Sequence, residues 1–505
     1  MPHIASTAPI FRVDGIRAIE ARFLPDAVPP LMERAGAAAA QIALQLLGSR
    51  AGPVLVACGP GNNGGDGFVL ARHLRAAGRE VIVAFSDDAA RLPADARDAH
   101  GAWLDAGGTC QPAIPERAFA LAVDALFGIG LTRPIAGRHA EWIERLNRLA
   151  RPDCPLLAID TPSGLDVDSG GVRGPCVRAS HTATFIALKP GLLTLDGPDH
   201  AGEVTLCDLD LDYAAEFPPP GRLNGPGLFA AHLLPRPRNS HKGSNGNALI
   251  IGGAPGMVGA ALLAGRAALR LGAGRVYVGL LDSRHPGVDA LQPELMLRPA
   301  REAIALSGAL AGALAIGPGL GQSNDARDLL RTAIDAALPL LLDADALNIV
   351  AAHPVLAGRL RRRSEPALLT PHPAEAARLL GADVAGVQRD RLACALELAR
   401  RFNACVVLKG CGSVLAAPGG EWAINPTGNP GMASAGMGDV LSGMVCALLA
   451  QGWPAWPALA GGVWLHGRAA DRLVERGDGP IGLAAGELID QARAALNQAI
   501  AGQSV

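Results

Sequence analysis

Short apolar runs alternate with helical patterns along almost the whole chain, and this alternation restricts the possible folds more than any other feature. The runs at residues 54–58 and 81–85 are continuously apolar, which is typical of strands buried on both faces of a parallel sheet. Stretches rich in alanine, leucine and arginine, such as residues 68–77 and 140–149, lie between the runs and favour helices. The pattern therefore predicts right-handed β-α-β crossovers and doubly wound α/β sheets. Further runs of the same kind occupy residues 121–123, 156–159, 248–251, 276–278, 313–316, 340–342, 367–369 and 406–408.

The length and local composition indicate two domains. A chain of 505 residues is longer than one hydrophobic core normally organises. Residues 217–221 read Phe-Pro-Pro-Pro-Gly and residues 224–227 read Asn-Gly-Pro-Gly, and such sequences continue neither a helix nor a central strand. We therefore predict a linker within residues 215–230, between α/β domains at residues 1–215 and 225–505.

Charge and aromatic content argue against a nucleic-acid partner. The formal net charge is −2, and the lysine and arginine residues are dispersed. Aromatic residues make up only 4% of the chain, so a base-stacking surface is not expected. The most basic run, residues 359–363, is more typical of a solvated loop or helix end than of a nucleic-acid patch.

Cysteine usage and hydropathy predict a cytoplasmic protein. The nine cysteines form no C-x-x-C pair, so neither a disulfide framework nor a zinc site is expected. The first residues lack the basic and apolar regions of a secretory signal. The apolar segment 257–280 is interrupted by Arg266, Arg270 and Arg275, so we expect no membrane span.

A glycine-rich motif follows the first apolar run and reads Gly-Pro-Gly-Asn-Asn-Gly-Gly-Asp-Gly at residues 59–67. Backbone N–H groups at such a strand-to-helix turn can receive phosphate. The motif satisfies G-x-G-x-x-G, and Asp87 and Asp88 end the next strand about 20 residues later, which leaves a Rossmann dehydrogenase as an alternative. Asparagine and aspartate between the glycines argue against that alternative, because bare backbone normally meets the pyrophosphate there.

Polar residues also follow other strands of the first half. Asp124 follows the run at 121–123, while Asp160 and Ser163 follow the run at 156–159. Ligands of open parallel sheets bind outside the carboxyl ends of the strands. Asn63, Asp124 and Ser163 are therefore candidates for a shared set of oxygen ligands, with Asp160 as a base in the same crevice. The alternatives are that Asp160 caps a helix and that Asp124 forms a turn.

Four stretches of the first half resemble the YjeF N-terminal family, the NAD(P)H-hydrate epimerases. They lie at residues 61–68, 123–131, 160–164 and 185–191, and the resemblance covers roughly residues 10–212. It implies a Rossmann-like three-layer α/β/α sandwich, with Asp160 as the catalytic acid/base that contacts the substrate. It also implies potassium binding by Asn63, Asp124 and Ser163. The residues that would bind the hydrated nucleotide, besides Asp160, are Asn62, Asn63, Gly64, Gly65, Asp66, Gly128, Ile129, Gly130, Leu131, Thr132, Arg133 and Pro134.

The second half carries its own acid-bearing glycine motif. Residues 436–443 read Gly-Met-Gly-Asp-Val-Leu-Ser-Gly, so an anion-binding helix start would lie beside Asp439, which can act as a base. The run at 406–408 leads into Lys409 and a glycine loop suited to a nucleotide. No Walker motif is present, so a P-loop fold is not expected. The alternatives are that Asp439 is a helix cap and that Lys409 is a surface lysine in a hairpin turn.

Several stretches of the second half resemble ribokinase-like folds and, more narrowly, the YjeF C-terminal family of NAD(P)H-hydrate dehydratases. The resemblance covers roughly residues 232–495. It implies that Ala260, Gly319, His372 and Asp439 contact the hydrate, although His372 alone also suits a loop histidine. The adenine nucleotide would contact Lys409, Gly410, Cys411, Gly412, Ser413 and Gly438. The matching stretches are residues 240–246, 250–253, 259–261, 317–321, 342–348, 369–375 and 428–443.

Two details depart from the related patterns. Cys411 stands where a small residue such as alanine or serine is expected, which puts the fit of the nucleotide in question. The segment Ser-Ala-Gly-Met-Gly-Asp at residues 434–439 differs from the Gly-Ala-Gly-Asp of sugar kinases and favours the dehydratase.

The resemblances together imply a bifunctional repair enzyme for hydrated NADH and NADPH, here NADHX and NADPHX. One domain would interconvert the R and S epimers, and the other would dehydrate the S form with ADP and Mg²⁺, giving AMP and phosphate. The alternatives are a ribokinase-like small-molecule kinase with a regulatory nucleotide-binding domain, and a scaffold or RNA-associated protein. A homo-oligomer is expected, because the alanine- and glycine-rich helices offer close packing surfaces.

Overall fold

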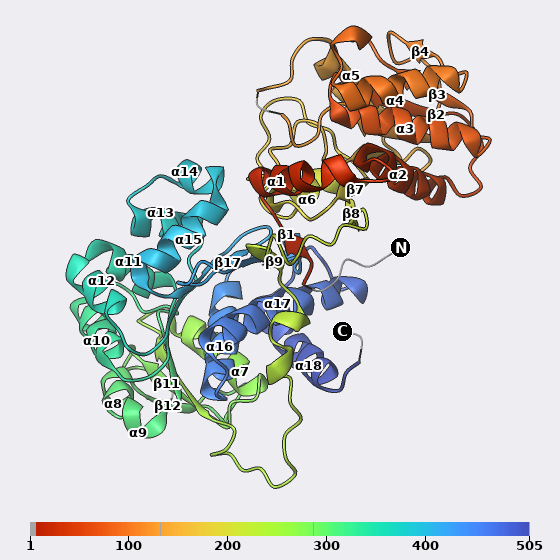
Figure 1. The fold of residues 1–505 in the computed structure, drawn as a ribbon. Coiled ribbons are helices and arrows are strands. Elements are labelled where there is room, and N and C mark those ends of the chain that lie inside the picture. The colour runs from red at the N-terminus through yellow and green to blue at the C-terminus, as the bar shows by residue number, and fades with distance from the viewer. Residues whose placement is uncertain (1–6, 132, 286, 504–505) are drawn as a thin grey trace. The chain divides into compact units, whose positions relative to one another are not determined.

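The computed structural model describes residues 7–131, 133–285 and 287–503. By the density of its internal contacts the chain divides into two compact units, Met1–Gly221 and Arg222–Val505. The division comes directly after Pro218, Pro219 and Pro220. Both units are α/β structures (Figure 1), which confirms the predicted fold class.

The N-terminal unit contains a seven-stranded sheet in the order β4-β3-β2-β5-β6-β7-β8, in which all pairings are parallel. The chain runs from β2 outward to β4 and then crosses to β5 on the other side of β2. The gap between β2 and β5 is therefore the topological switch point, where open α/β sheets bind ligands. The strands are β2 (Val54–Cys58), β3 (Val81–Ala84), β4 (Cys110–Gln111), β5 (Leu121–Ala125), β6 (Leu156–Ile159), β7 (His181–Phe185) and β8 (Glu203–Cys207).

Helices cover both faces of this sheet. Val54 and Val56 point to the face covered by α1, α2, α3 and α4, whereas Leu55 and Ala57 point to the face covered by α5. Successive residues of a strand face opposite sides, so continuous apolar runs are required in the central layer of a three-layer sandwich. The helices are α1 (Val13–Phe23), α2 (Leu31–Leu47), α3 (Asn62–Ala76), α4 (Ala94–Asp105) and α5 (Arg138–Leu149), and a short α6 (Gly197–Ala201) precedes β8.

Helix α3 begins earlier than the sequence predicts. We expected a helix from residue 68, but it begins at Asn62, so the glycine motif forms its first turns. Glycine and asparagine are poor helix formers. Here they allow close packing, because a Cβ on Gly64 would lie 2.0 Å from the Gly59 carbonyl oxygen and one on Gly67 would lie 2.7 Å from Ala125 Cβ.

The C-terminal unit is built on a second sheet with the strand order β18-β17-β16-β15-β14-β13-β10-β11-β12. It is parallel from β12 to β16, and β17 and β18 continue it as antiparallel strands. The order reverses between β10 and β13, which gives this sheet its own switch point. The strands are β10 (Asn247–Gly252), β11 (Arg275–Leu280), β12 (Met296–Pro299), β13 (Ala313–Ile316), β14 (Leu340–Leu342), β15 (Ala367–Leu369), β16 (Cys405–Leu408), β17 (Val414–Ala416) and β18 (Trp422–Ile424).

The core on one face of this sheet is formed by α7 (Val258–Arg270), α16 (Met437–Ala450), α17 (Ala455–Glu475) and α18 (Leu488–Ile500). Figure 1 shows a second group of helices, including α10 to α12, away from these four. The further helices of the unit are α8 (Ala300–Ala305), α9 (Ser307–Leu310), α10 (Asn324–Asp335), α11 (Ala344–Ala352), α12 (Pro354–Arg361), α13 (Pro373–Leu380), α14 (Val384–Arg389) and α15 (Arg391–Phe402). Two short strands, β1 (Pro9–Ile10) and β9 (Gly221–Leu223), complete the set of strands.

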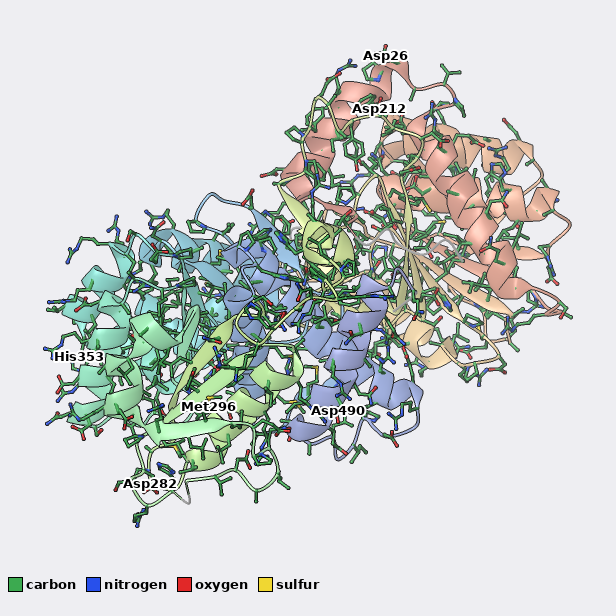
Figure 2. The ribbon with its side chains drawn as sticks, turned by 90° about the horizontal axis from the view of Figure 1, so that it is seen from below. Asp26, Asp212, Asp282, Met296, His353 and Asp490 are labelled. Atoms are coloured by element: carbon green, nitrogen blue, oxygen red, sulfur yellow. The ribbon has the colours of Figure 1, made fainter. Side chains whose placement is uncertain are left out.

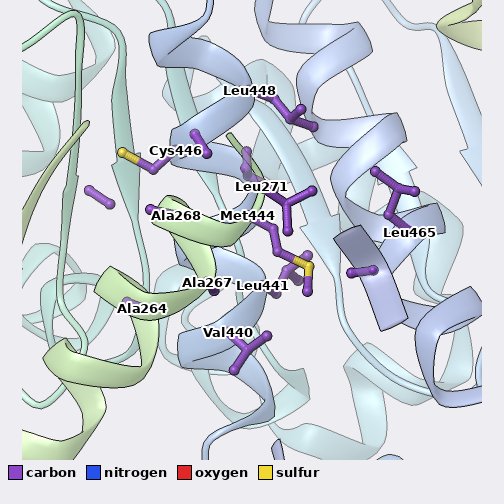
Figure 3. Packing of buried hydrophobic residues seen from close by; sticks show 14 of the residues in the cluster. Ala264, Ala267, Ala268, Leu271, Val440, Leu441, Met444, Cys446, Leu448 and Leu465 are labelled. Atoms are coloured by element: carbon purple, nitrogen blue, oxygen red, sulfur yellow. The ribbon is translucent and has the colours of Figure 1, made fainter. Parts of the chain in front are cut away.

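Helices α7 and α16 pack with their backbones in close approach. A Cβ on Gly443 would lie 2.0 Å from the carbonyl oxygen of Ala264, so only glycine fits there. Figure 3 shows Ala264 and Ala268 on α7 beside Val440 and Met444 on α16, where small residues make room for larger ones. This packing fixes the N-terminus of α16, which carries the second glycine motif.

Exposed acidic residues form ion pairs with nearby arginines, as two examples show. Asp26 and Asp490 are exposed acids, both labelled in Figure 2, and they pair with Arg22 and Arg270 respectively. Within the described residues, no helix has both the length and the apolar character needed to cross a bilayer.

Candidate active sites

A cavity of about 380 Å³ opens at the switch point of the N-terminal sheet. It is lined by the turn that follows β2, the segment that follows β5, and side chains from α1, α3 and the ends of β6 and β7. Of the residues expected to bind the hydrate, those that line the cavity are Asn62, Asn63, Asp66, Gly128, Ile129, Gly130, Leu131 and Asp160.

The remaining expected contacts have other surroundings. A Cβ on Gly65 would lie 2.6 Å from the Met32 side chain, and Gly64 approaches Gly59, so both glycines serve helix packing. Neither residue lines the cavity, and neither do Arg133 and Pro134. Thr132 lies outside the described residues.

Asp160 is held in a strained and specific position. It has a φ of 64°, which is rare for a residue with a side chain and is found where surrounding structure imposes it. Lys189 Nζ donates to Asp160 Oδ1 at 2.6 Å, and the Ile129 N–H donates to Oδ2 at 3.3 Å. No helix begins at Asp160, so the helix-cap alternative is wrong.

Lys189 is a site residue that the sequence reasoning missed. Its side chain is fully buried, and Nζ also donates to Thr184 Oγ1 at 2.8 Å and to the Phe185 carbonyl at 2.9 Å. Three acceptors satisfy all three N–H donors of the Lys189 ammonium group and hold it against Asp160. A lysine inside the apolar run at 185–191 was the available signal, because buried lysines are rare unless paired.

Of the three expected potassium ligands, Asp124 and Ser163 bond to each other, and Asn63 lines the cavity. Asp124 is fully buried within β5, where its carboxylate accepts from Ser163 N at 2.8 Å and from Ser163 Oγ at 2.7 Å. It also accepts from the Leu126 N–H, so the turn-forming alternative describes part of its role. Asn63 is buried, and neither polar atom of its amide has a hydrogen-bond partner within the described part of the chain.

This donor set fits a monovalent cation. Burial raises the pKa of Asp124 to about 6 despite the hydrogen bonds from Ser163, so its charge lacks full compensation. The unpartnered Asn63 amide oxygen offers a further neutral ligand. A Cβ on Gly128 would lie 3.2 Å from this oxygen and 2.9 Å from Asp160 Oδ2, so both side chains are close to Gly128. Among the described residues, no group of three or more His, Cys, Asp or Glu side chains is arranged to hold a metal ion.

The second candidate site lies at the N-terminus of α16. Lys409 Nζ donates to Asp343 Oδ1 at 2.9 Å, and Ser442 Oγ donates to Asp343 Oδ2 at 2.8 Å. Gly438 lies beside this pair, because a Cβ there would be 3.2 Å from Lys409 Nζ. A cation and a helix N-terminus thus converge on one locus, as a phosphate site requires. Lys409 is therefore not a mere surface lysine, although its loop does join the antiparallel strands β16 and β17 as a hairpin, as the alternative interpretation expected.

Asp439 stands in the first turn of α16. The N-cap is Gly436, so Asp439 is not the helix cap that the sequence left open. Burial and the nearby charge of Asp343 raise the pKa of Asp439 to about 6, although Lys409 acts in the opposite direction. Burial tends to lower the pKa of Lys409, yet Asp343, Glu375 and Asp439 raise it, so the lysine stays charged. A carboxyl group with such a pKa can act as a base near neutral pH.

The loop after β16 packs closely against the side chain of Arg391. Gly410 has a φ of 148°, and a Cβ there would lie 2.7 Å from the guanidinium of Arg391. Ser413 Oγ donates to the Gly410 carbonyl at 3.0 Å and closes the loop, while Cys411 is exposed at its tip. Arg391 is almost fully buried and donates to the Leu408 carbonyl, a supporting role that the sequence analysis missed.

The residues expected to contact the hydrate lie in two places. Gly319 and Ala260 are neighbours, because a Cβ on Gly319 would lie 3.2 Å from Ala260 Cβ. His372 is the N-cap of α13: its Nδ1 accepts from the Ala374 N–H, and its own N–H donates to Glu375. His372 Nε2 also lies 3.2 Å from Glu375 Oε1, so this histidine has a local capping role, and its contact with the hydrate stays a prediction.

Comparisons with known proteins bear on both halves. The family described as YjeF-related protein N-terminus matches residues 29–191, and the NAD(P)H-hydrate dehydratase family matches residues 248–492. The bifunctional NAD(P)H-hydrate repair enzyme Nnr of Escherichia coli K12 is 41% identical over 451 residues, which cover 88% of this chain and 85% of that protein. The chain belongs to the bifunctional NAD(P)H-hydrate repair enzyme family.

Solved structures resemble the C-terminal unit. A ribokinase-like superfamily protein from Enterococcus faecalis V583 is 25% identical, with a TM-score of 0.50, covering 55% of this chain and 96% of that one. The ribokinase-like fold expected for the second half is thus confirmed. An ADP/ATP-dependent NAD(P)H-hydrate dehydratase from Bacillus subtilis, co-crystallised with ATP and Mg²⁺, is 31% identical, with a TM-score of 0.46, covering 53% of this chain and 96% of that one.

Proposed function

We propose that the two sites divide the repair of hydrated NADH and NADPH between them. The N-terminal cavity interconverts the R and S hydrates, and the site at α16 dehydrates the S hydrate with ADP. The observation that carries this proposal is that each unit holds its own largely buried carboxyl group, Asp160 in the cavity of the N-terminal sheet and Asp439 in the first turn of α16. Membership of a bifunctional family supports assigning one activity to each unit.

In the N-terminal cavity Asp160 moves the proton. The hydrate carries a hydroxyl group and a ring nitrogen on C6, so changing the configuration of C6 requires proton transfer at these positions. Lys189 fixes Oδ1 of Asp160 and leaves Oδ2 facing Gly128 and Ile129 at the cavity wall. The backbone at Asn62 and the glycines at 128 and 130 would receive the rest of the nucleotide.

Potassium would be held by Asn63, Asp124 and Ser163. When bound, it supplies a positive charge that compensates Asp124 and orders the loops around it. Its role would be structural, because a monovalent cation is a weak Lewis acid. Ser163 and Asp124 already join the segments that follow β5 and β6, so a cation there would stiffen both walls of the cavity.

In the C-terminal site Asp439 accepts the proton of the C6 hydroxyl group as its oxygen attacks the terminal phosphorus of ADP. The bond from that phosphorus to the bridging oxygen breaks, and AMP leaves. The phosphate ester at C6 then leaves as phosphate while C5 loses a proton, which gives NADH or NADPH. Lys409 and the N–H groups at Gly438 stabilise the transferring group. Mg²⁺ would accompany the ADP phosphates, with Asp343 as the carboxylate within reach of that locus.

The identity of the products tests the proposal. The purified chain is given pure S hydrate of NADH with ADP and Mg²⁺, and the products are separated by chromatography. We expect NADH, AMP and phosphate in equal amounts. A stable phosphorylated hydrate would instead establish a ribokinase-like kinase. The small-molecule partners in this proposal are NADHX, NADPHX and ADP, and self-association of the chain remains a prediction.

A further inference from the structure

Helix α1 supplies a third carboxyl group to the N-terminal cavity, in addition to those of Asp66 and Asp160. Ile16, Arg17 and Glu20 all line the cavity, and they lie on one face of the helix because residues three and four apart are neighbours. Ile16 is 1% exposed and anchors this face in the core. The helix precedes residues 29–191, which the N-terminal family matches, and none of the motifs includes it.

The surroundings of Glu20 raise the pKa of its carboxyl group. Its carboxyl group has no hydrogen-bond or ion-pair partner among the residues that the structure describes. Burial and the charge of Asp160 raise the pKa of Glu20, while Lys189 and Arg17 act to lower it. The contrast with Asp160 is clear, because Asp160 receives a lysine ammonium at 2.6 Å. One cavity therefore holds the lysine-paired carboxylate of Asp160 and two further carboxyl groups, those of Glu20 and Asp66, an arrangement suited to simultaneous base and acid roles.

Two further observations indicate that the cavity is built for a polar ligand. The Asn63 amide lines the cavity and is more than nine-tenths buried, and its Nδ2 group, which cannot ligate a cation, has no partner among the described residues. Asp66 also lines the cavity, and burial together with the charge of Asp160 raises its pKa well above the ordinary value. A ligand with donors and acceptors would satisfy these groups.

We propose that Glu20 is a second catalytic residue of the epimerase, which donates a proton to the ring nitrogen of the hydrate while Asp160 takes one from its hydroxyl group. This proposal rests on the epimerase function proposed for the N-terminal cavity.

The proposed step opens and recloses the ring. The C6 hydroxyl gives its proton to Asp160, a C6=O bond forms, and the electrons of the C6–N1 bond pass to N1. Glu20 protonates N1 as the bond breaks. After rotation about the C5–C6 bond, N1 attacks the other face of the aldehyde and returns its proton to Glu20, while Asp160 returns its proton to the oxygen. No water is lost, so the step changes the epimer without forming NADH, and no oxidant is needed.

The first test compares three variants in the full-length chain. Pure R hydrate of NADH is supplied without ADP, so that dehydration is silent, and formation of the S hydrate is followed by chromatography. We expect Glu20→Gln to lower kcat for epimerisation by about 100-fold with little change in KM, because general acid catalysis is worth about 10²–10⁴-fold. Glu20→Asp should retain more activity than Glu20→Gln. Asp14→Asn, an exposed acid on the same helix, should stay within about twofold of the unchanged chain.

The order of the variants separates catalysis from structure. If Glu20 only supported the fold, the isosteric glutamine would be tolerated better than the shorter aspartate, and that order would overturn the proposal. Unchanged epimerisation in Glu20→Gln would also overturn it while leaving the epimerase function intact. Absence of epimerisation in the unchanged chain would instead remove the function on which the proposal rests.

A pH profile gives the second test. The groups that face Glu20 are Arg17 on α1, Asp66 on α3, Asp160 after β6 and Lys189 after β7. A proton donor must be protonated, so the epimerisation rate should fall as pH rises through the raised pKa of Glu20. Glu20→Gln should lack this fall in its residual rate. If the rate of Glu20→Gln fell in the same way at alkaline pH, the fall would come from another titrating group, and the proposal would be overturned.

Discussion

At the scale of single residues, the pKa of Asp439 predicts how the dehydration rate depends on pH. Its pKa is raised to about 6 by burial and by Asp343, and a base works only when it has lost its proton. The dehydration rate should therefore be low at acidic pH, rise through about pH 6 and stay high above it. Asp439→Asn should lower the rate by about 10²–10⁴-fold above about pH 7, and by less at acidic pH, where Asp439 is already protonated. The exposed ion-paired acid in Asp325→Asn serves as the control.

The measurement is kcat/KM for dehydration of pure S hydrate across the pH range. An acid limb that persisted unchanged in the residual activity of Asp439→Asn would show that a different group titrates. In that case Asp439 would not be the base of this site.

The raised pKa of Asp124 leads to a second prediction, which concerns the stability of the fold. Its pKa in the folded chain is about 6, above the ordinary value, because the buried carboxylate lacks a countercharge. Without potassium, the free energy of unfolding should therefore fall as pH rises from the ordinary pKa through about 6. Potassium should offset this loss, so it should raise the Tm of the N-terminal transition more at about pH 8 than at about pH 5.

Thermal unfolding with potassium or choline chloride at matched ionic strength measures this effect. Asp124→Asn should remove the specific response to potassium. An equal response to both salts in the unchanged chain would argue against a cation bound by Asn63, Asp124 and Ser163.

At the scale of elements, two glycines of α16 should behave in opposite ways. Gly438→Ala places a methyl group 3.2 Å from Lys409 Nζ, where it would narrow the phosphate site. We expect a higher KM for ADP with little loss of stability, since the helix propensity of alanine is better than that of glycine by about 1 kcal/mol. Gly443→Ala would meet the Ala264 carbonyl at 2.0 Å and should lower stability by about 1–3 kcal/mol through overpacking.

Kinetics with varied ADP and denaturant unfolding distinguish the two outcomes. The expectation fails if Gly438→Ala unfolds more easily than Gly443→Ala, or if it leaves the KM for ADP unchanged.

The elements also show what the sequence could predict. Central strands such as β2 and β10 were recognised because burial on both faces requires an unbroken apolar run. The edge strand β12 (Met296–Pro299) was missed, because a partly exposed strand ending in arginine and proline carries no such run. The start of α3 was misplaced because tertiary packing at Gly64 and Gly67 overrides helix propensity.

Site residues were recognisable only where a motif marked them. Asp160 and Asp439 stand directly in glycine-rich or strand-end motifs. Glu20 has no such local mark, and the unusual lysine in the apolar run at 185–191 does not show that Lys189 pairs with Asp160, because the cavity that they share is formed by segments distant in sequence. Proximity of that kind is a tertiary property that a single sequence does not display.

At the scale of the whole chain, the account requires two independent sites. Each sheet has its own switch point and its own acid, and no residue is assigned to both sites. A stereospecific dehydratase consumes only the S hydrate, so an epimerase in the same chain lets both epimers be repaired. Substitutions at Asp160 should therefore leave the dehydration of pure S hydrate unchanged, and substitutions at Asp439 should leave epimerisation unchanged.

The most direct test follows NADH absorbance as the chain acts on a mixture of R and S hydrates with ADP and Mg²⁺. The unchanged chain should convert the whole mixture rapidly. Asp160→Ala should stop the rapid phase near the amount of S hydrate supplied, and Asp439→Ala should abolish conversion. Rapid conversion of the whole mixture by Asp160→Ala, or any substantial conversion by Asp439→Ala, would contradict the assignment of the two reactions to these two sites.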